Sequence, residues 1–295
     1  MLLKEGSRGQ EVVELQEALG IGADGVFGPG TRAAVEAYQK EHGLVADGIV
    51  GPQTFAAIRE ENATTDNSEK VYSPYEGLVV NKSFLPKGEY KEGPTQKEYL
   101  FLHHTAGWNN PYKTIDGWAK DDRGSIATEF VLGGCSVRGN DNRYDGELVQ
   151  CLPEGSYGWH LGASGSRHMH THSVAIEVCN FSYAENGKTY VSTPIVADQL
   201  VELPEPFRGH SQWHMYSDKQ IETLRLFILW IAERDSIDIR AGLVDEIQKK
   251  GPKAFEFNED AYNGRIKGMW THANIRKDKF DLFPQPDLID MLVSL

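Results

Sequence analysis

Short apolar runs alternate with longer amphipathic stretches over the second two thirds of the chain, a pattern that predicts strands mixed with helices. The clearest helix is predicted over 218–235, where apolar residues recur at helical spacing after Asp218, which can cap the first turn. Further elements are predicted as strands at 98–104, 127–132, 146–151, 173–179 and near 267–271, and as helices at 113–121, 242–250 and 286–293. The fold class expected from this pattern is an α/β domain with a mixed central sheet flanked by helices.

The N-terminal segment follows a different pattern, a near-repeat in which Ala23–Thr31 returns 23 residues later as Ala46–Thr54. Each copy has an Asp-Gly turn, an apolar pair, a Gly-Pro turn and a threonine that can cap the helix that follows. A further amphipathic helix is predicted at about 9–19. Together these features predict a small three-helix domain.

Composition and pattern divide the chain into three parts. We expect the helical domain at 1–60, a linker and lead-in at 61–95, and the α/β domain at 96–295. The linker assignment depends on a polar stretch without periodicity. Within the α/β domain, 181–217 is long and irregular, and we interpret it, like 237–266, as an insertion that frames the binding groove.

The 295 residues carry a formal net charge of −13 and no basic stripe, which argues against a nucleic-acid partner. No apolar run approaches the roughly 20 residues needed to span a bilayer, and the start of the chain lacks the apolar segment of a signal peptide. Cys135, Cys151 and Cys179 lie in apolar surroundings and are expected to be buried free thiols. We therefore expect a monomer made in the cytoplasm, without stable membrane association.

Candidate metal ligands lie at the ends of two predicted strands. His103 and His272 each follow a short apolar run, and open α/β sheets place their ligands at the carboxyl ends of strands. Asp281 follows His272 closely enough for a loop to return to the same ion. Two imidazoles, a carboxylate and a fourth position for water can hold a catalytic zinc ion. Glu177 can then act as a general base, and Lys279 can stabilise an oxyanion.

Other histidines are less suited to bind a metal. His104 follows His103 directly and faces the other side of the strand, so packing behind the site is the favoured interpretation. The run of alternating histidines at 168–172 has the context of a surface loop, and His210 and His214 favour surface positions.

The N-terminal segment closely resembles the peptidoglycan-binding domain type 1 family. The residues that carry this resemblance are Gly6–Gly9, Val12, Leu15-Gln16, Leu19, Asp24-Gly25, Phe27-Gly28, Thr31, Tyr38-Gln39, Asp47-Gly48 and Thr54. The resemblance implies a module that holds the protein on the cell wall.

The second domain resembles the N-acetylmuramoyl-L-alanine amidase type 2 family, which includes phage endolysins. The matching pieces are Phe101–Ala106, Glu129–Leu132, Trp159–Gly162, Ser173–Glu177 and His272–Asp281. The resemblance implies that His103, His272 and Asp281 are zinc ligands, that Glu177 is the general base, and that Lys279 stabilises the transition state. By the same resemblance Trp159 and His160 line the substrate groove, and His104 and Thr105 are further candidate substrate contacts.

These expectations together describe a modular endolysin that binds Zn²⁺ and hydrolyses the amide between N-acetylmuramic acid and L-alanine of peptidoglycan. The expected setting is a bacteriophage protein that acts on the cell wall after release. Two alternatives stay open, namely a non-catalytic peptidoglycan recognition protein and a bacterial amidase that remodels or recycles the wall.

Overall fold

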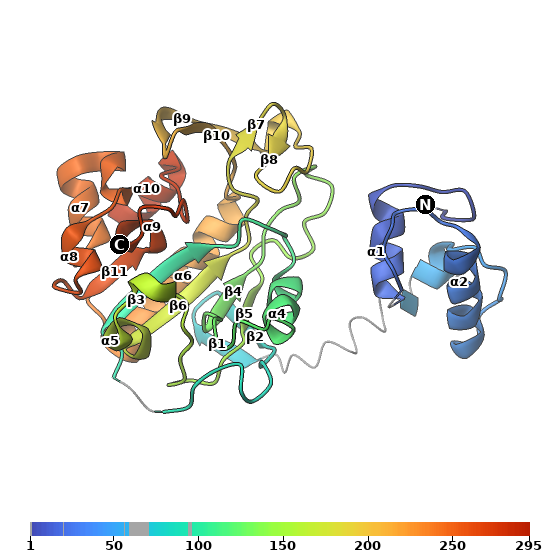
Figure 1. The fold of residues 1–295 in the computed structure, drawn as a ribbon, viewed down its shortest axis with the longest axis horizontal. Coiled ribbons are helices and arrows are strands. Elements are labelled where there is room, and N and C mark those ends of the chain that lie inside the picture. Colours follow the sequence, from blue (N-terminus) through green and yellow to red (C-terminus); the bar gives the residue numbers. More distant parts are fainter. Residues whose placement is uncertain (1, 20, 56, 59–70, 94–95) are drawn as a thin grey trace. The chain divides into compact units, whose positions relative to one another are not determined.

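The computed structural model describes residues 2–19, 21–55, 57–58, 71–93 and 96–295. The chain forms two compact units, Met1–Asn67 and Ser68–Leu295 (Figure 1). The predicted boundary at residue 60 and the polar stretch of the predicted linker lie outside the described residues.

The N-terminal unit contains the helices predicted from the repeat. Helix α1 spans Gln10–Ala18, α2 spans Pro29–Glu41, and residues 52–55 and 57–58 are also helical. The helices pack around a small apolar core made of Leu3, Val12, Leu15, Phe27, Val35, Val50 and Ile58. The first residues of the unit also join this core, because Leu3 forms an isolated bridge with Val50.

The sequence repeat is also a repeat of buried hydrogen bonds. The Gln16 side chain donates to the Asp24 carboxylate at 2.8 Å and accepts from the Gly25 backbone N–H at 2.9 Å. Its counterpart Gln39 makes the same two contacts one repeat later, with Asp47 and Gly48. Each glutamine also donates to the threonine of its repeat. Both side chains are almost fully buried, so each one fixes an Asp-Gly turn against its helix.

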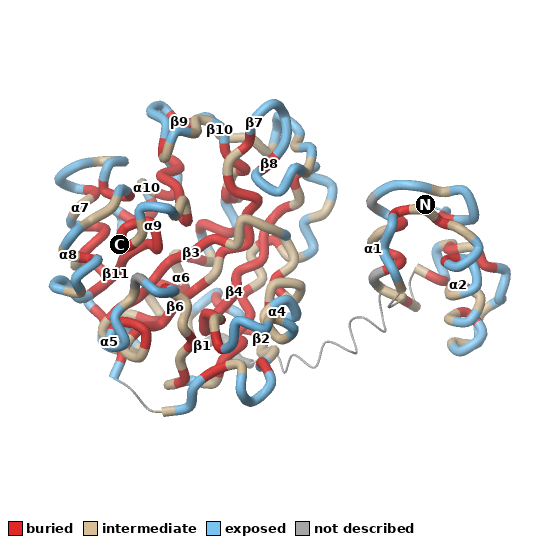
Figure 2. The backbone as a smooth tube through the Cα atoms, viewed as in Figure 1, coloured by how far each residue is buried: buried red, intermediate tan, exposed pale blue. Residues whose placement is uncertain are grey.

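A seven-stranded mixed sheet forms the centre of the second unit, in the order β1-β2-β5-β4-β6-β3-β11. The strands are β1 (Val71–Tyr75), β2 (Leu78–Lys82), β3 (Tyr99–His104), β4 (Phe130–Leu132), β5 (Leu148–Gln150), β6 (Ser173–Val178) and β11 (Gly268–Thr271). The strands β4, β6, β3 and β11 are mutually parallel, and β5 is antiparallel to β4. The central strands β3 and β4 are buried along their whole length, and β6 is buried except at Glu177 (Figure 2), as expected when helices cover both faces.

Helices cover both faces of this sheet. The helices are α4 (Pro111–Ala119), α5 (Arg167–Thr171), α6 (Asp218–Asp235), α7 (Leu243–Lys250), α8 (Glu259–Tyr262), α9 (His272–Ile275) and α10 (Pro286–Val293), with 3-10 turns at 162–164, 197–199 and 251–255. Helix α6 begins with a capping box between Ser217 and Gln220 and packs Phe227 against Phe130 of the sheet. The α/β class, the mixed sheet and the long helix are therefore confirmed.

Three segments differ from the sequence-based expectation. Strands β1 and β2 come from the stretch assigned to the linker, yet they pair with the central sheet through β5. The segment 181–217 is not irregular, because it forms the hairpins β7 (Ala184–Glu185) with β8 (Lys188–Thr189) and β9 (Leu200–Phe207) with β10 (His210–His214). The run of histidines at 168–172 lies mostly on helix α5 rather than in a loop. Short strands with prolines and glycines lack the alternating pattern on which strand prediction depends.

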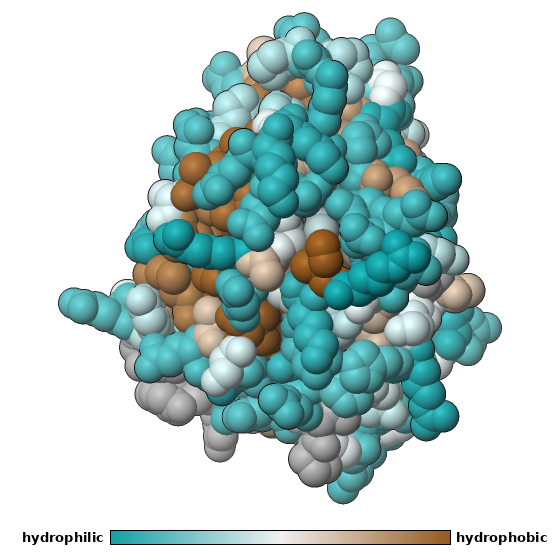
Figure 3. Space-filling view, turned by 90° about the vertical axis from the view of Figure 1, so that its left-hand side faces the viewer, coloured by the Kyte–Doolittle hydropathy of each residue, from teal (hydrophilic) through white to brown (hydrophobic). Residues whose placement is uncertain are grey.

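The three cysteines are buried and free, as expected. Among the residues that the structure describes, no helix is both long and apolar enough to cross a bilayer. The face of the second unit that carries α7 and α8 is mostly hydrophilic, and its hydrophobic side chains lie in small separate groups (Figure 3).

Candidate metal centre

Strand register brings the candidate site residues to one edge of the sheet. His103 and Glu177 are direct partners across the parallel strands β3 and β6, and paired residues point to the same face of a sheet. Strand β11 runs beside β3 and ends at Thr271, the residue paired with Leu102, so His272 follows next to His103. The parallel strands of the central sheet therefore place both predicted histidine ligands and the predicted base side by side.

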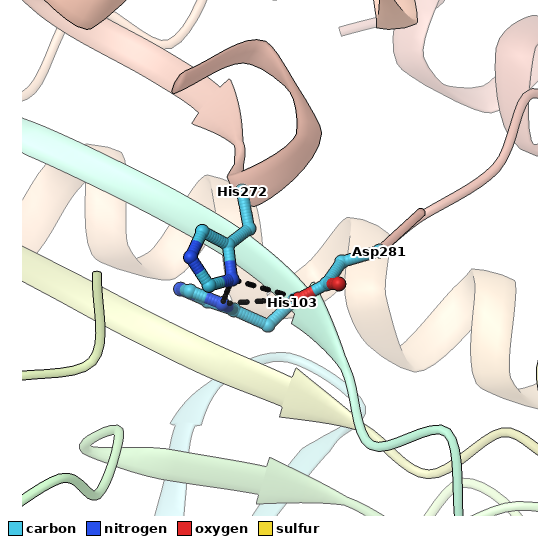
Figure 4. Close-up of side chains that lie close together, drawn as sticks. All are labelled: His103, His272 and Asp281. Atoms are coloured by element: carbon cyan, nitrogen blue, oxygen red, sulfur yellow. Dashed lines mark hydrogen bonds and ion pairs between the residues drawn. The ribbon is translucent and has the colours of Figure 1, made fainter. Parts of the chain in front are cut away.

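The side chains of His103, His272 and Asp281 point toward one another (Figure 4). The two Nδ1 atoms of the histidines lie 3.0 Å apart, and the Asp281 Oδ2 atom lies 2.9 Å from His272 Nδ1 and 3.5 Å from His103 Nδ1. Ligand atoms about 2.0–2.1 Å from a tetrahedral zinc ion lie roughly 3.3 Å from one another. The spacing in this protein therefore fits such an ion with one position left open.

The electrostatics of these residues also fit a cation. Burial, reinforced by the charge of His272, lowers the pKa of His103 to about 4, so its imidazole is neutral and able to bind a metal. Burial on its own would raise the pKa of Asp281, but its contacts with the two histidines outweigh burial and hold that pKa well below its usual range. Two imidazoles and a carboxylate form a donor set that zinc accepts.

A chain of hydrogen bonds orients the His103 ring. Its Nε2 atom lies 3.0 Å from His160 Nδ1, and His160 Nε2 lies 2.8 Å from the Ser173 hydroxyl. Because the Nδ1 atom of His103 faces the other ligands, its proton is assigned to Nε2, which donates to His160. The structure thus places His160 next to the candidate ligand His103, where it fixes the orientation of the ring, an arrangement that is usual around histidines that bind metals.

His104 lies on the opposite face of β3 from His103 and is only 3% exposed. Its Nδ1 atom lies 2.8 Å from the Tyr216 hydroxyl and accepts the backbone N–H of Leu282 at 3.1 Å. Leu282 follows Asp281 directly and has a positive φ of 57°, which is strained for a leucine. His104 therefore holds the loop that carries Asp281, which agrees with packing behind the site and differs from the substrate contact expected for it.

Glu177 and Lys279 flank the three candidate ligands. Glu177 is partly buried, and burial, with the nearby Asp281 charge, raises its pKa well above the usual range, while Lys279 opposes this shift. Lys279 is partly exposed, and its charge also acts on His103. A carboxyl group and a cation therefore lie close enough to Asp281 and His103 to act on them electrostatically.

Thr105 and Trp159, the other predicted substrate contacts, each have partners within the protein. The Thr105 hydroxyl donates to the Asn180 carbonyl at 3.2 Å, so it connects the loops that follow β3 and β6. Trp159 is partly buried and packs its ring edge-on against His170. His170 in turn lies 3.1 Å from the Gly162 carbonyl and does not contact the candidate ligands.

Sequence reasoning did not find Tyr216, Leu282 and Ser173 as supporting residues. Each of them contacts a histidine from a different part of the chain, and no local spacing or motif marks such contacts. His214 was expected near the surface, but it is fully buried, with its ring edge-on to that of Phe181.

Fold and site together define an α/β domain with a buried His-His-Asp centre at the ends of its parallel strands, preceded by a small helical repeat domain. Residues 93–277 match the N-acetylmuramoyl-L-alanine amidase family, and residues 8–58 match a peptidoglycan binding domain. The first match covers more than half of the chain, so the chain belongs to the N-acetylmuramoyl-L-alanine amidase family.

Several solved structures are similar to parts of this chain. The SleB N-terminal domain is 33% identical over 21% of this chain and 92% of its own, with a TM-score of 0.20. The PlyG catalytic domain is 11% identical, with coverage of 66% and 78% and a TM-score of 0.37. AmpD is 15% identical, with coverage of 72% and 93% and a TM-score of 0.37. The comparison with curated proteins finds no match to this chain.

Proposed function

We propose that this protein is a zinc-dependent amidase that hydrolyses the bond between N-acetylmuramic acid and the L-alanine of the peptidoglycan stem peptide. The observation that carries the proposal is the convergence of His103, His272 and Asp281 next to Glu177, in a chain of the amidase family. A non-catalytic recognition protein is the less favoured alternative, because the three candidate ligands and the candidate base are all present in the chain and lie close together.

His103, His272 and Asp281 would hold the zinc ion, which supplies Lewis acidity and lowers the pKa of a bound water to about 7. Glu177 accepts a proton from the attacking water, and the water oxygen forms a bond to the lactyl carbonyl carbon. Lys279 stabilises the negative charge that develops on the carbonyl oxygen. Glu177 then returns the proton to the amine of L-alanine as the C–N bond breaks.

The N-terminal unit would bind peptidoglycan and keep the catalytic unit close to its polymeric substrate. Tethering of this kind raises the effective substrate concentration without any change in the catalytic site. We place the protein in the setting of a phage endolysin that acts on the cell wall after release. A holin gene beside its own gene would support that setting, and a bacterial wall-recycling gene cluster would contradict it.

Mass spectrometry of digested cell walls tests the proposed bond. The expected products are free stem peptides that begin with L-alanine and glycan strands without peptides. Products cut within the stem peptide or within the glycan would refute the assignment.

Loss of turbidity of purified walls, with and without a chelator, tests the metal. We expect the chelator to abolish lysis and added zinc to restore it. Lysis that continues after complete removal of zinc would exclude the metal mechanism while leaving the bond assignment open.

A further inference from the structure

A cavity of about 470 Å³ lies on the β7–β8 hairpin, outside the metal centre. Its lining comes from the insertion 181–217 and consists of Tyr183, Glu185, Asn186, Lys188, Thr189, Tyr190 and Ser192. The hairpin lies next to β9–β10 (Figure 1). The insertion has therefore built a concave surface of its own on the catalytic unit.

An aromatic wall joins this cavity to the loop that carries the catalytic residues. The rings of Tyr183 and Tyr190 meet edge-on at 5.4 Å, and both pack against Phe280, at 5.5 Å and 6.2 Å. Phe280 lies between Lys279 and Asp281 in the chain. A ligand in the cavity would consequently lie beside the catalytic loop and touch the same continuous surface.

The wall is held in place before any ligand binds. Tyr183 stacks on His210 with 3.5 Å between the ring centroids and 7° between the ring planes, and His210 bonds to Glu185 at 2.8 Å. The Tyr190 backbone N–H donates to the Tyr183 carbonyl at 2.8 Å. Tyr190 itself stays half exposed, at 50%. A fixed aromatic ring with an open surface reduces the entropy lost on binding.

The polar groups of the cavity favour a neutral, hydroxyl-rich ligand. Asn186, Thr189 and Ser192 contribute an amide and two hydroxyl-bearing side chains, and the charges of Glu185 and Lys188 are opposite. Such a lining, beside an exposed tyrosine, matches a sugar ring, which has one apolar face and polar edges.

A second cavity, of about 440 Å³, provides the contrast. It lies at α8 and α9, and its lining holds two cations, Arg276 and Lys277, and two carboxylates, Glu259 and Asp278. Arg276 pairs with Asp278, and the tyrosine of this cavity, Tyr262, packs against Phe257 and not against Phe280.

We infer that the cavity on the β7–β8 hairpin is a saccharide subsite, in which Tyr190 packs against a sugar of the glycan strand next to the cleaved bond. The inference rests on the proposed function, because it assumes that the catalytic loop faces peptidoglycan. Tyr190 acts in this picture by contact with substrate and takes no part in bond cleavage.

Substrate length separates this role from a structural one. The full-length protein is assayed on two defined substrates, a muramoyl peptide with one sugar and a tetrasaccharide that carries the same peptide. For Tyr190→Ala we expect KM to rise roughly 3- to 10-fold on the longer substrate, in line with the usual strength of aromatic packing. We expect KM on the short substrate and kcat on both to be unchanged, and Tyr190→Phe to behave like the wild type.

Tyr262→Ala is the matched control, because Tyr262 is also an exposed tyrosine, at 43%, but belongs to the second cavity. Its KM should show no dependence on saccharide length. Equal changes on both substrates for Tyr190→Ala, or none on either, would overturn the subsite.

Failure of the proposed function is recognised separately. If the wild type cleaves neither substrate, titration calorimetry with the peptide-free tetrasaccharide still tests the cavity, since the N-terminal unit contributes equally to wild type and variant. Weaker binding by Tyr190→Ala would support the subsite, and identical binding would refute it.

Discussion

Replacement of His104 tests whether the residues behind the metal centre determine its affinity. The His104→Phe variant keeps a ring of similar size but loses the acceptor for the Leu282 N–H and the contact with the Tyr216 hydroxyl. Since Leu282 directly follows Asp281, the loss should release the carboxylate ligand rather than either histidine ligand. Weaker metal binding is therefore the expected result.

The size of the effect follows from the buried N–H group. Leu282 is fully buried, and a buried donor left without an acceptor costs about 1–3 kcal/mol. A tenfold change in affinity corresponds to about 1.4 kcal/mol. If the whole cost appears in the free energy of zinc binding, the affinity for zinc falls roughly 5- to 150-fold. Loss of outer contacts of metal ligands in other proteins costs about 10- to 100-fold. We expect the His104→Phe variant to bind zinc 10- to 100-fold more weakly, by order of magnitude.

Zinc titration against a competing chromophoric chelator measures this affinity, and thermal unfolding of the same samples reports the fold. His214→Phe is the matched control, because His214 is equally buried but accepts from the Phe181 N–H, away from the ligand loop. His104→Asn, which can place an oxygen near the lost Nδ1 atom, should restore much of the affinity. Unchanged zinc affinity in a destabilised His104→Phe variant would show that His104 supports only the fold.

Three other outcomes are expected. Glu177→Gln should lower kcat by about 10²–10⁴-fold while leaving zinc affinity near that of the wild type, and an equal loss of zinc would contradict its role as base. Gln39→Ala should destabilise the N-terminal unit by about 1–3 kcal/mol in denaturant titrations, because it removes buried hydrogen bonds to Asp47 and Gly48. An unchanged free energy of unfolding would show that this turn does not depend on Gln39. The hydrogen bond from Gln16 lowers the pKa of Asp24, and the backbone N–H of Ile49, with Gln39, lowers that of Asp47. The stability that these two carboxylates contribute should therefore be complete above about pH 4 and should be lost as the pH falls through their lowered pKa values. A melting temperature that does not change with pH in this acid range would contradict this.

The long elements and the positions of the two candidate histidine ligands could be predicted because their signals are local. Helix α6 spans the predicted residues, since its apolar face and its cap are both written in consecutive residues. His103 and His272 were marked by their position after apolar runs, and parallel pairing of β3 with β11 converts that position into proximity. Asp281 was proposed from its distance along the chain, since nine residues after His272 are enough for a loop to return, and the family resemblance supported the same choice.

The supporting contacts could not be predicted for a physical reason. His160 and Ser173 lie in a turn and at a strand start, yet their hydrogen bond sets the orientation of a ring on β3. The contact of His104 with Leu282 joins residues that are 178 positions apart. Side-chain hydrogen bonds of this kind depend on final packing, which a pattern along the chain does not contain.

The central sheet and the segments that line the cavities have different roles, and this difference predicts which residues determine substrate preference. The central sheet fixes His103, Glu177 and His272 through backbone register, so these positions tolerate little change without loss of the site. The lining of the two described cavities comes instead from residues 183–192 for the first, and from residues 257–263 and 275–278 for the second. Exchange of side chains in those segments changes contacts with substrate but leaves the strand ends in place. Variants of Tyr190 should therefore alter KM, whereas variants of Glu177 should alter kcat, and a reversal of these effects would contradict the division.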